Sequence, residues 1–489
     1  MAQRHGRALT LQDIPAEDPA TYDMLCQADS MGVFQVESRA QMAMLPRLRP
    51  RCFYDLVVEV AIVRPGPIQG GMVHPYLRRR QGLEPVRVPG PGLQQALGRT
   101  LGVPVFQEQV MQVAMLAAGF DADEADSLRR AMAAWRRRGG VHRFYQRIVS
   151  GMVARGYDAA FAEQIFEQIQ GFGEYGFPES HAASFALLVY VSAWMKRHEP
   201  ACFLAALLNS QPMGFYRPAQ LVQDAKRHGV QVLPVDVLHS DWDCTLEGPK
   251  RDRVRLGLRL VSGLGQAQAQ RVVQACRAQP PIDVADLAAR ASLPSATLRL
   301  LAHANALSSL AGPRPQQWWE AAAVQPATPL PMTVRSDPAD EVAWPAPSAP
   351  QQVWHDYRST GLSLHGHPLQ FLRAKLHARG VQRARDLYPL AHGRRVRAAG
   401  LVTMRQQPSS ANGVLFVTLE DETGHVNVIV WPKLKQRHAA VWRHARLLVV
   451  HGVWQRDQVA GQVTHVVAAW AQDISDWLGT LPSPSRDFH

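Results

Sequence analysis

The stretch that decides the fold of the middle of this chain is Leu258-Arg259-Leu260-Val261-Ser262-Gly263-Leu264-Gly265, followed by Ala267 and the apolar pair Val272-Val273. This is the hxxhxGhGxxxA pattern of a helix–hairpin–helix element, where h is an apolar residue. Its two glycines allow a turn that exposes backbone N–H groups at a helix N-terminus, where a phosphate oxygen is favoured. The pattern therefore predicts binding to the DNA backbone, with an ordinary capped hairpin as the alternative. The predicted contacts are Ser262, Gly263, Leu264 and Gly265.

A second, glycine-poor copy of the hairpin runs from Ile282 to Leu307. Its apolar positions suit the core of two packed helices, so we expect this copy to be structural. They are Leu287, Leu293, Leu298, Leu301 and Leu307. Residues 246–312 are thus predicted to form a tandem helix–hairpin–helix DNA-binding module.

Downstream of the hairpins, residues 313–390 are predicted to hold a Pro/Ala-rich linker and a short helical segment. Five β-branched runs broken by turns follow, with a short helix at 433–442 between the third and the fourth. The runs are Val396–Val402, Val414–Leu419, Val426–Trp431, Leu447–Val453 and Val463–Ala468. This order is typical of a five-stranded OB-fold barrel, which we place at 391–474, before an extended tail at 475–489.

The predicted barrel combines basic and aromatic residues, a mixture that suits single-stranded nucleic acid because bases stack on aromatic faces. The basic residues are Arg394, Arg395 and Arg397, and the aromatic ones are Phe416, Trp431 and Trp454. Aromatic residues of a small barrel also serve as core, so each of these three has that alternative.

Upstream of the hairpins, residues 1–245 are predicted to be helical. A helix begins at Asp18-Pro19, others are expected at 106–118, 121–135 and 141–171, and 182–208 is a long apolar helical stretch. The apolar run that starts at Val57 stops at Arg64-Pro65-Gly66-Pro67, where two prolines and a glycine fix a loop. The predicted fold class is therefore multidomain and mainly α, with a C-terminal barrel.

Composition agrees with a nucleic-acid partner. The 489 residues carry 53 Lys and Arg against 41 Asp and Glu, a net charge of +12, which favours a polyanion, although a GC-rich genome also drifts a chain toward arginine. The five cysteines are scattered and form no CxxC pair, which argues against disulfides and zinc. No apolar run approaches the about 18 residues of a membrane span, so we expect a soluble, cytoplasmic protein.

Two kinds of charged residue are candidates for chemistry. The tandem Arg129 and Arg130 lie in a predicted helix and can clamp a triphosphate through forked hydrogen bonds, although a solvated face is the commoner fate of a charge run. Paired acids occur at Asp121/Asp123 and Asp241/Asp243. Neither pair lies on a strand beside a second acidic strand, so we predict no two-metal site and no catalytic residue in this chain.

Several segments resemble the fingers of bacterial polymerase III alpha-type enzymes, the C-family DNA polymerases. They are Val33–Arg39, Ala61–Met72, Phe106–Gln112, Leu128–Met132 and Tyr175–Ala183. Their order, followed by hairpins, linker and barrel, covers nearly the whole chain. The ending Ser485–His489 resembles the error-prone, damage-tolerance branch.

The resemblance implies template-directed nucleotide addition to a primer 3′ end, in translesion synthesis. It assigns the phosphates of the incoming nucleotide to Arg129 and Arg130, and gives supporting places near the nucleotide pocket to Arg64, Ser180 and His181. In the family, Mg²⁺ is held by palm aspartates that precede the fingers, and this sequence begins after them, so we expect the chain alone to be inactive.

The implied partners are primer–template DNA, deoxynucleoside triphosphates, a sliding clamp and damage-tolerance accessory proteins. For the clamp the sequence offers only Gln325–Met332, which has no aromatic anchor and reads better as a plain linker. The alternative function is that of a non-enzymatic DNA-binding remnant that keeps only its hairpins and barrel.

Overall fold

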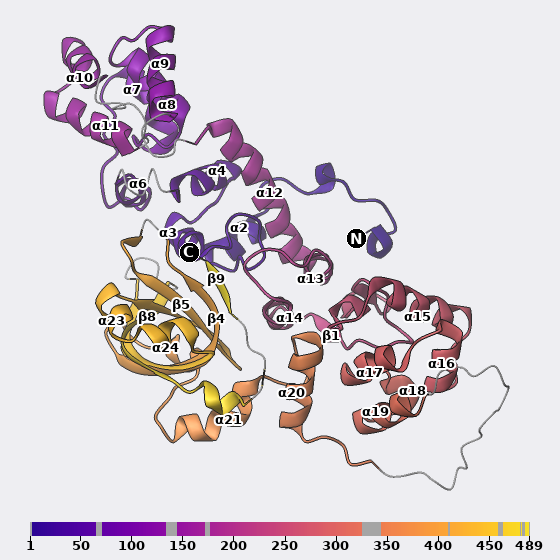
Figure 1. Ribbon diagram of the computed structural model, residues 1–489. Helices are drawn as coiled ribbons and strands as arrows, with labels where there is room; N and C mark the ends of the chain where they lie inside the picture. The colour runs from indigo at the N-terminus through magenta and orange to yellow at the C-terminus, as the bar shows by residue number, and fades with distance from the viewer. Residues whose placement is uncertain are drawn as a thin grey trace. The chain divides into compact units, whose positions relative to one another are not determined.

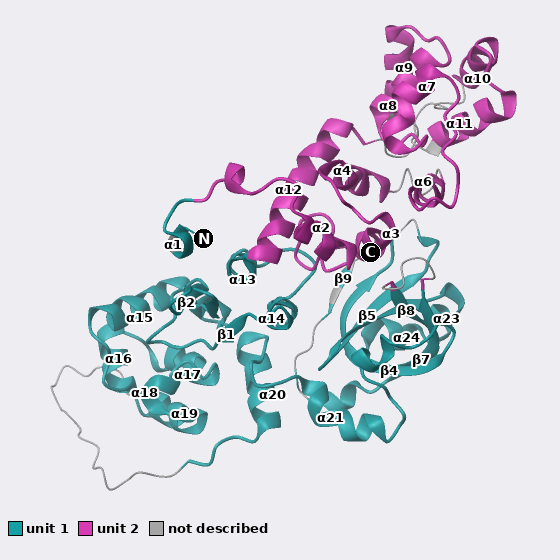
Figure 2. Cartoon of the chain, turned by 180° about the vertical axis from the view of Figure 1, so that it is seen from behind, with its two compact units in different colours: residues 1–8, 199–456, 464–489 teal, residues 9–198, 457–463 magenta. Residues whose placement is uncertain are grey.

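The computed structural model describes residues 2–64, 71–133, 144–171, 177–324, 344–408, 411–457, 463–479, 481 and 485–488. The chain forms two compact units (Figure 2), and each is described by itself. Unit 1 comprises residues 1–8, 199–456 and 464–489, and unit 2 comprises residues 9–198 and 457–463. Among the described residues, no helix has the length and apolar character needed to cross a membrane.

Unit 2 is helical, as predicted (Figure 1). Its main helices are α2 (Pro19–Cys26), α3 (Arg39–Leu48), α4 (Phe53–Ile62), α6 (Val73–Arg80), α7 (Pro91–Leu97), α8 (Gln107–Leu116), α9 (Ala122–Ala133), α10 (Tyr145–Ala154), α11 (Ala159–Gly171) and α12 (Glu179–His198). Helix α2 begins as expected, because the Asp18 carboxylate accepts the backbone N–H of Thr21 at 2.9 Å. Helix α9 begins with a reciprocal cap, in which Asp121 and Glu124 each accept the other's backbone N–H.

The long apolar stretch predicted at 182–208 is two helices. Helix α12 ends at His198, and α13 (Pro200–Asn209) begins at the next proline. Proline has no N–H to donate and its ring clashes with the preceding turn, so Pro200 ends one helix and suits the first turn of the next.

The core of unit 2, in its described part, includes a carboxylic side chain without a hydrogen-bond partner. Glu59 lies in the middle of α4, which packs on α12, and its side chain is fully buried. Neither carboxylate oxygen is hydrogen bonded. Burial raises the pKa of Glu59 well above its ordinary value, so the protonated form is favoured at this position.

We expect Glu59→Leu to raise the free energy of unfolding by about 1–3 kcal/mol at neutral pH, because it removes an unsatisfied polar group from the core. In the unfolded chain the glutamate ionises above a pKa of about 4.3, whereas the raised pKa keeps it protonated in the native state. The free energy of unfolding of the wild-type chain therefore falls as pH rises, and the advantage of Glu59→Leu over the wild type should grow with pH. Urea denaturation between about pH 4 and pH 8 measures this. Glu59→Gln, which cannot titrate, is the control, and a wild-type curve parallel to that of Glu59→Gln would contradict the account.

In unit 1 the hairpin module is preceded by a small sheet that the sequence did not predict. Strand β3 (Arg253–Arg255) lies between β1 (Gln231–Leu233), which is parallel to it, and β2 (Thr245–Glu247), which is antiparallel. The helices of this part are α14 (Pro218–Arg227), α15 (Gln266–Ala278), α16 (Val284–Ala291), α17 (Ser295–His303), α18 (Ser308–Ala311) and α19 (Arg314–Ala323). All five leucines predicted for the core of the second hairpin are buried.

The segment between the hairpins and the barrel contains α20 (Ala349–Thr360), α21 (Pro368–His377) and α22 (Ala384–Leu387). Helix α20 is tied to α19 by a buried network around Asp356. Its carboxylate accepts hydrogen bonds from Arg314 Nη2 at 2.5 Å, Ser363 Oγ at 2.6 Å and His365 Nδ1 at 2.9 Å. Burial alone raises the pKa of Asp356, but the hydrogen bonds from His365, Ser363 and Arg314 outweigh it and hold the pKa below its ordinary value.

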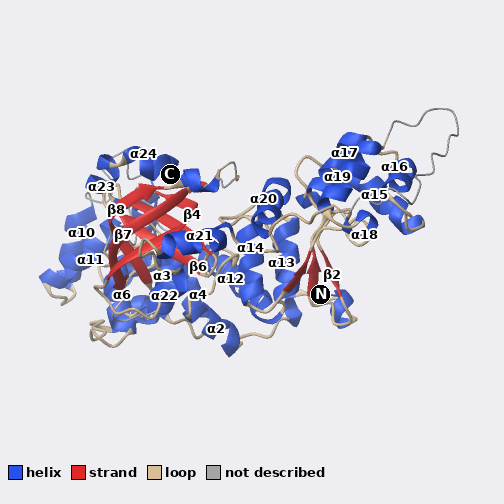
Figure 3. Cartoon of the chain, turned by 90° about the horizontal axis from the view of Figure 1, so that it is seen from below, coloured by secondary structure: helices blue, strands red, loops and turns tan. Residues whose placement is uncertain are grey.

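The C-terminal part of unit 1 is a closed barrel, which confirms the predicted OB fold (Figure 3). Its strands are β4 (Arg395–Gln406), β5 (Leu415–Asp421), β6 (Gly424–Val430), β7 (Leu447–Arg456) and β8 (Thr464–Asp473). Strand β4 closes the barrel by pairing with β7 through its first half and with β5 through its second. The predicted helix between the third and fourth strands is α23 (Pro432–Arg437) followed by α24 (Ala439–His444), and β9 (Arg486–Phe488) adds the tail to β4.

Candidate nucleic-acid interface

The tandem arginines of unit 2 lie in the last turns of α9, where they share one carboxylate. Asp126 Oδ1 is 2.8 Å from Arg129 Nη2, and Asp126 Oδ2 is 3.1 Å from Arg130 Nε. The hydrogen bond from Arg129 and the nearby positive charges hold the pKa of Asp126 below its ordinary value. All three side chains are partly exposed. Ion pairs between exposed side chains are weak, so a polyanion can displace the carboxylate.

Two of the other predicted nucleotide residues, Arg64 and His181, contact Phe177 in the same unit. The Arg64 guanidinium lies 4.6 Å from the ring centroid of Phe177, and the ring of His181 lies 5.0 Å from it at 70°. Ser180 and His181 are exposed in the first turn of α12. Among the described residues, no contact joins this group to Arg129 and Arg130. The rest of the proline loop after Arg64 lies outside the described residues. So do Arg136, Arg137 and Arg138, which follow the tandem arginines in the sequence.

The turn of the first hairpin, in unit 1, has the geometry that its glycines require. Gly263 has a φ of +82°, a conformation that other residues adopt only with strain. Its N–H makes no hydrogen bond within the described part of the chain, and the N–H of Gly265 makes only a long one, 3.4 Å, to Gln268. The backbone at these two glycines is exposed at the N-terminus of α15.

The other two predicted hairpin residues are placed differently. The N–H of Ser262 donates to the carbonyl of Ser359 in α20 at 2.8 Å, so this backbone donor is already engaged. Leu264 is buried, and its N–H donates to the carbonyl of Val261. Leu264 therefore anchors the turn, and the candidate phosphate donors are the N–H groups of the glycines.

In the barrel, Arg394, Arg395 and Arg397 are all exposed at the start of β4. The aromatic residues separate into two kinds. Trp454 is a core residue with 1% of its surface exposed, whereas Trp431, just after β6, is 55% exposed. Phe416 is half-buried. Of the three aromatic candidates, Trp431 is thus the one with an open face.

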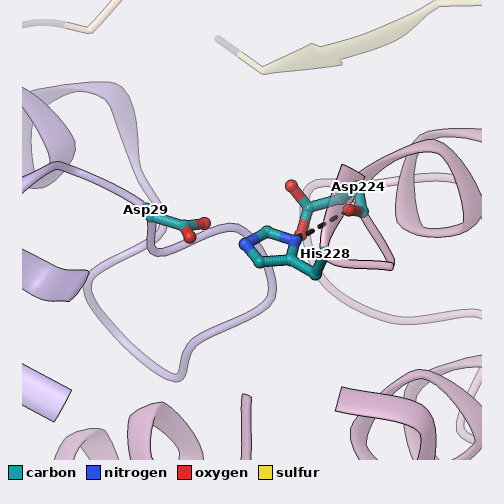
Figure 4. A group of neighbouring side chains, drawn as sticks. All are labelled: Asp29, Asp224 and His228. Atoms are coloured by element: carbon teal, nitrogen blue, oxygen red, sulfur yellow. Dashed lines mark hydrogen bonds and ion pairs between the residues drawn. The ribbon is translucent and has the colours of Figure 1, made fainter. Parts of the chain in front are cut away.

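Three of the four acids considered as metal ligands make other contacts, and the fourth, Asp123, lies in the first turn of α9. Asp121 caps α9, Asp241 pairs with Arg277, and Asp243 pairs with Arg259 at 2.6 Å. Figure 4 shows a further acidic group, in which His228 Nδ1 hydrogen bonds to the carbonyl of Asp224 in the same helical turn at 2.8 Å. Asp29, also drawn there, belongs to the other compact unit, where its carboxylate pairs with Lys196 at 2.8 Å.

The sequence analysis did not identify three residues of these surfaces. Asp126 precedes the arginines by three and four residues, a helical ion-pair spacing that could have revealed it. His451 and Trp470 lie side by side on the barrel with ring centroids 4.8 Å apart. Trp470 lies beyond the predicted end of the last strand, and no sequence pattern indicated it.

A helical unit, a hairpin module whose first turn has open backbone donors and an OB barrel with exposed arginines together define a modular nucleic-acid-binding protein. Comparison with known families gives the same three parts. The bacterial DNA polymerase III alpha subunit finger domain matches residues 1–156, a helix-hairpin-helix motif matches 229–317, and an OB-fold nucleic acid binding domain matches 396–468.

Individual relatives match the chain over its full length. The error-prone DNA polymerase of Alkalilimnicola ehrlichii is 58% identical over 494 residues, covering 100% of this chain and 48% of the relative. Those of Bordetella bronchiseptica and Pseudomonas aeruginosa are 57% and 53% identical, each over 100% of this chain and 47% of the relative. The chain is thus similar over its whole length to error-prone DNA polymerases, and it spans about half the length of the curated relatives it matches.

Proposed function

We propose that this chain supplies the nucleotide-binding fingers and the DNA-binding modules of an error-prone DNA-directed DNA polymerase. Such an enzyme adds deoxynucleotides to a primer 3′ end, and its setting is damage-induced mutagenesis and translesion synthesis. The observation that carries the proposal is that this whole chain matches about half of each relative named error-prone DNA polymerase, and that the finger domain family matches its first 156 residues.

The site geometry supports a division of labour between the two units. Arg129 and Arg130 of unit 2 offer two guanidinium forks held by a displaceable carboxylate, which suits the phosphates of a deoxynucleoside triphosphate. Gly263 and Gly265 of unit 1 offer backbone donors at a helix N-terminus, which suit the phosphates of primer–template DNA. Arg394, Arg395 and Arg397 add positive charge on the barrel.

The chemistry of nucleotidyl transfer requires divalent metal, for which we propose Mg²⁺. The ion would neutralise charge that develops on the transferring phosphate. Within the described residues, the paired acids of this chain do not fit such a site, because arginines or a helix N-terminus already engage them. We therefore assign no reaction step to residues of this chain.

The DNA-binding part of the proposal is tested by titrating a fluorescent primer–template duplex with the chain at several salt concentrations. Affinity should fall as salt rises, with a logarithmic slope of about −0.9 per neutralised phosphate. It should not depend on the duplex sequence, because the hairpin donors contact the backbone alone. Binding that is insensitive to salt would contradict the electrostatic account.

Two glycine variants sharpen the same titration. Gly265 has an ordinary φ, and a Cβ at this position would lie 3.6 Å from Gln268 Oε1, so Gly265→Val should fold normally while covering the donors of α15. We expect it to weaken duplex binding about tenfold, on the order of one hydrogen bond to a charged group. Gly263→Val should weaken it too, with added backbone strain and a lower melting temperature. Unchanged affinity in Gly265→Val would exclude the hairpin from the interface.

The second candidate function is that of a non-enzymatic DNA-binding protein, which would use only the hairpin turn and the barrel. It predicts the same salt dependence, but it gives Arg129 and Arg130 no role. Nucleotide-dependent effects of those arginines, described below, separate the two functions.

A further inference from the structure

Three residues form a row across the neighbouring strands β4, β7 and β8 on the outer face of the barrel. Arg397 is paired in register with His451, and His451 with Trp470. The rings of His451 and Trp470 meet edge to face, with centroids 4.8 Å apart and an interplanar angle of 69°. Trp470 is 40% exposed and Arg397 is exposed, so the row presents an indole and a guanidinium on either side of His451.

The backbone of β8 is built to turn Trp470 outward. His451 pairs with Trp470 and the next residue, Gly452, pairs with Ala468, which leaves Ala469 as the extra residue of a β-bulge. Without the bulge, alternation would point Trp470 to the same side as the buried Ala468, into the barrel. The bulge puts both Ala469 and Trp470 on the exposed side.

The strand opposite the bulge is adapted to it. A Cβ at Gly452 would lie 2.2 Å from the backbone oxygen of Val467, so this position has no room for any side chain. A glycine inside a strand usually lowers stability. At position 452 a glycine is nevertheless required, because the bulged strand β8 approaches too closely for any side chain. A bulge that re-aims a side chain is a common feature beside binding sites.

In this row Arg397 is positively charged, whereas the aromatic side chains His451 and Trp470 are neutral. Arg397 Nη1 donates to the carbonyl of Arg379 at 2.8 Å, which fixes the guanidinium beside the strands. Burial and the neighbouring Arg397 lower the pKa of His451, so its ring is uncharged at neutral pH and packs against the indole as an aromatic group. Arg395 lies two residues before Arg397 on the same side of β4.

We propose that one base of single-stranded DNA stacks on Trp470 while an adjacent phosphate contacts Arg397. Base stacking on an exposed indole and backbone contacts from arginine are the two interactions that hold single strands on such barrels. The face differs from the strand 2–3 face that OB folds commonly use, which here is β5 and β6. This inference rests on the proposed function, because it takes a DNA strand to be the ligand of the barrel.

The test is fluorescence anisotropy of a labelled oligothymidylate of about 12 nucleotides with the full chain. Trp470→Ala should weaken binding about 5- to 150-fold, the range of one lost base stack, and Trp470→Phe should retain most of the affinity. Arg397→Gln should reduce the salt slope by about 0.7, one phosphate contact of a single strand. The matched controls are Trp319→Ala, an exposed tryptophan of α19, and Arg437→Gln, an arginine of α23.

Three results would overturn the proposal. If Trp470→Ala binds as tightly as Trp319→Ala, the indole is not a stacking platform. If Trp431→Ala weakens binding and Trp470→Ala does not, the strand lies at the end of β6, and the proposed function stands without this inference. If the unmodified chain does not bind the oligothymidylate at low salt, both this inference and the single-strand role of the barrel fail.

Discussion

Alanine at Arg129 or Arg130 is expected to raise the nucleotide concentration needed for half-maximal primer extension about 10- to 150-fold. This corresponds to about 1.5–3 kcal/mol, the contribution of a hydrogen bond to a charged group. The enzyme to be measured is a full-length chimera, in which this chain replaces the matching half of the Alkalilimnicola ehrlichii relative. The readout is the nucleotide dependence of single-turnover extension.

DNA affinity of the same variants should barely change, because the duplex phosphates are assigned to the hairpin glycines of the other unit. Lysine at either position should rescue nucleotide use only in part, since a point charge does not reproduce the fork of arginine. Arg87→Ala, an exposed arginine of the same unit, is the matched control for loss of charge. An unchanged nucleotide dependence in both alanine variants would mean that the pair is a solvated helix face.

Replacing Asp356 with asparagine is expected to lower the free energy of unfolding of unit 1 by about 3–5 kcal/mol. The substitution leaves the buried guanidinium of Arg314, whose side chain is 4% exposed, without a counter-charge. Because the pKa of Asp356 is lowered, its stabilising contribution is present above the unfolded value of about 3.9 and is lost as pH falls. Urea denaturation near neutral pH and in mild acid measures both effects.

The double variant Arg314→Met/Asp356→Leu is the control, because it removes both charges and should recover most of the stability. Asp356→Asn alone should also weaken duplex binding. Its helix, α20, supplies the Ser359 carbonyl that holds the N–H of Ser262 in the hairpin turn. A stable Asp356→Asn chain with unchanged duplex affinity would show that α20 does not position the hairpin.

Structural elements that are determined by residues close together in the sequence were predictable. The five barrel strands follow the β-branched runs, because a strand's residue preferences are visible along its own length, although β4 and β8 extend beyond their predicted ends at Val402 and Ala468. The start of α2 followed from the capping side chain of Asp18. The turn at Gly263 followed from glycine itself, since few other residues adopt its backbone conformation.

Features that depend on a distant strand or helix were not predictable. The strands β1 to β3 have three residues each, too few to show a period, and they are stabilised by one another. The outward turn of Trp470 depends on a bulge set by the pairing of β8 with β7, and on the absence of a side chain at Gly452. The role proposed for Arg129 and Arg130 rests on family resemblance, because their spacing alone favoured a solvated helix face, and it stays a prediction.

The most direct test of the central claim is single-turnover primer extension by the chimera, with this chain alone assayed in parallel. We predict that the chimera extends a primer in a Mg²⁺-dependent reaction, that this chain alone binds the same primer–template without extending it, and that Arg129→Ala/Arg130→Ala suppresses extension at low nucleotide concentration. A folded, DNA-binding chimera that extends no primer at saturating nucleotide would contradict the claim that this chain supplies functional polymerase fingers.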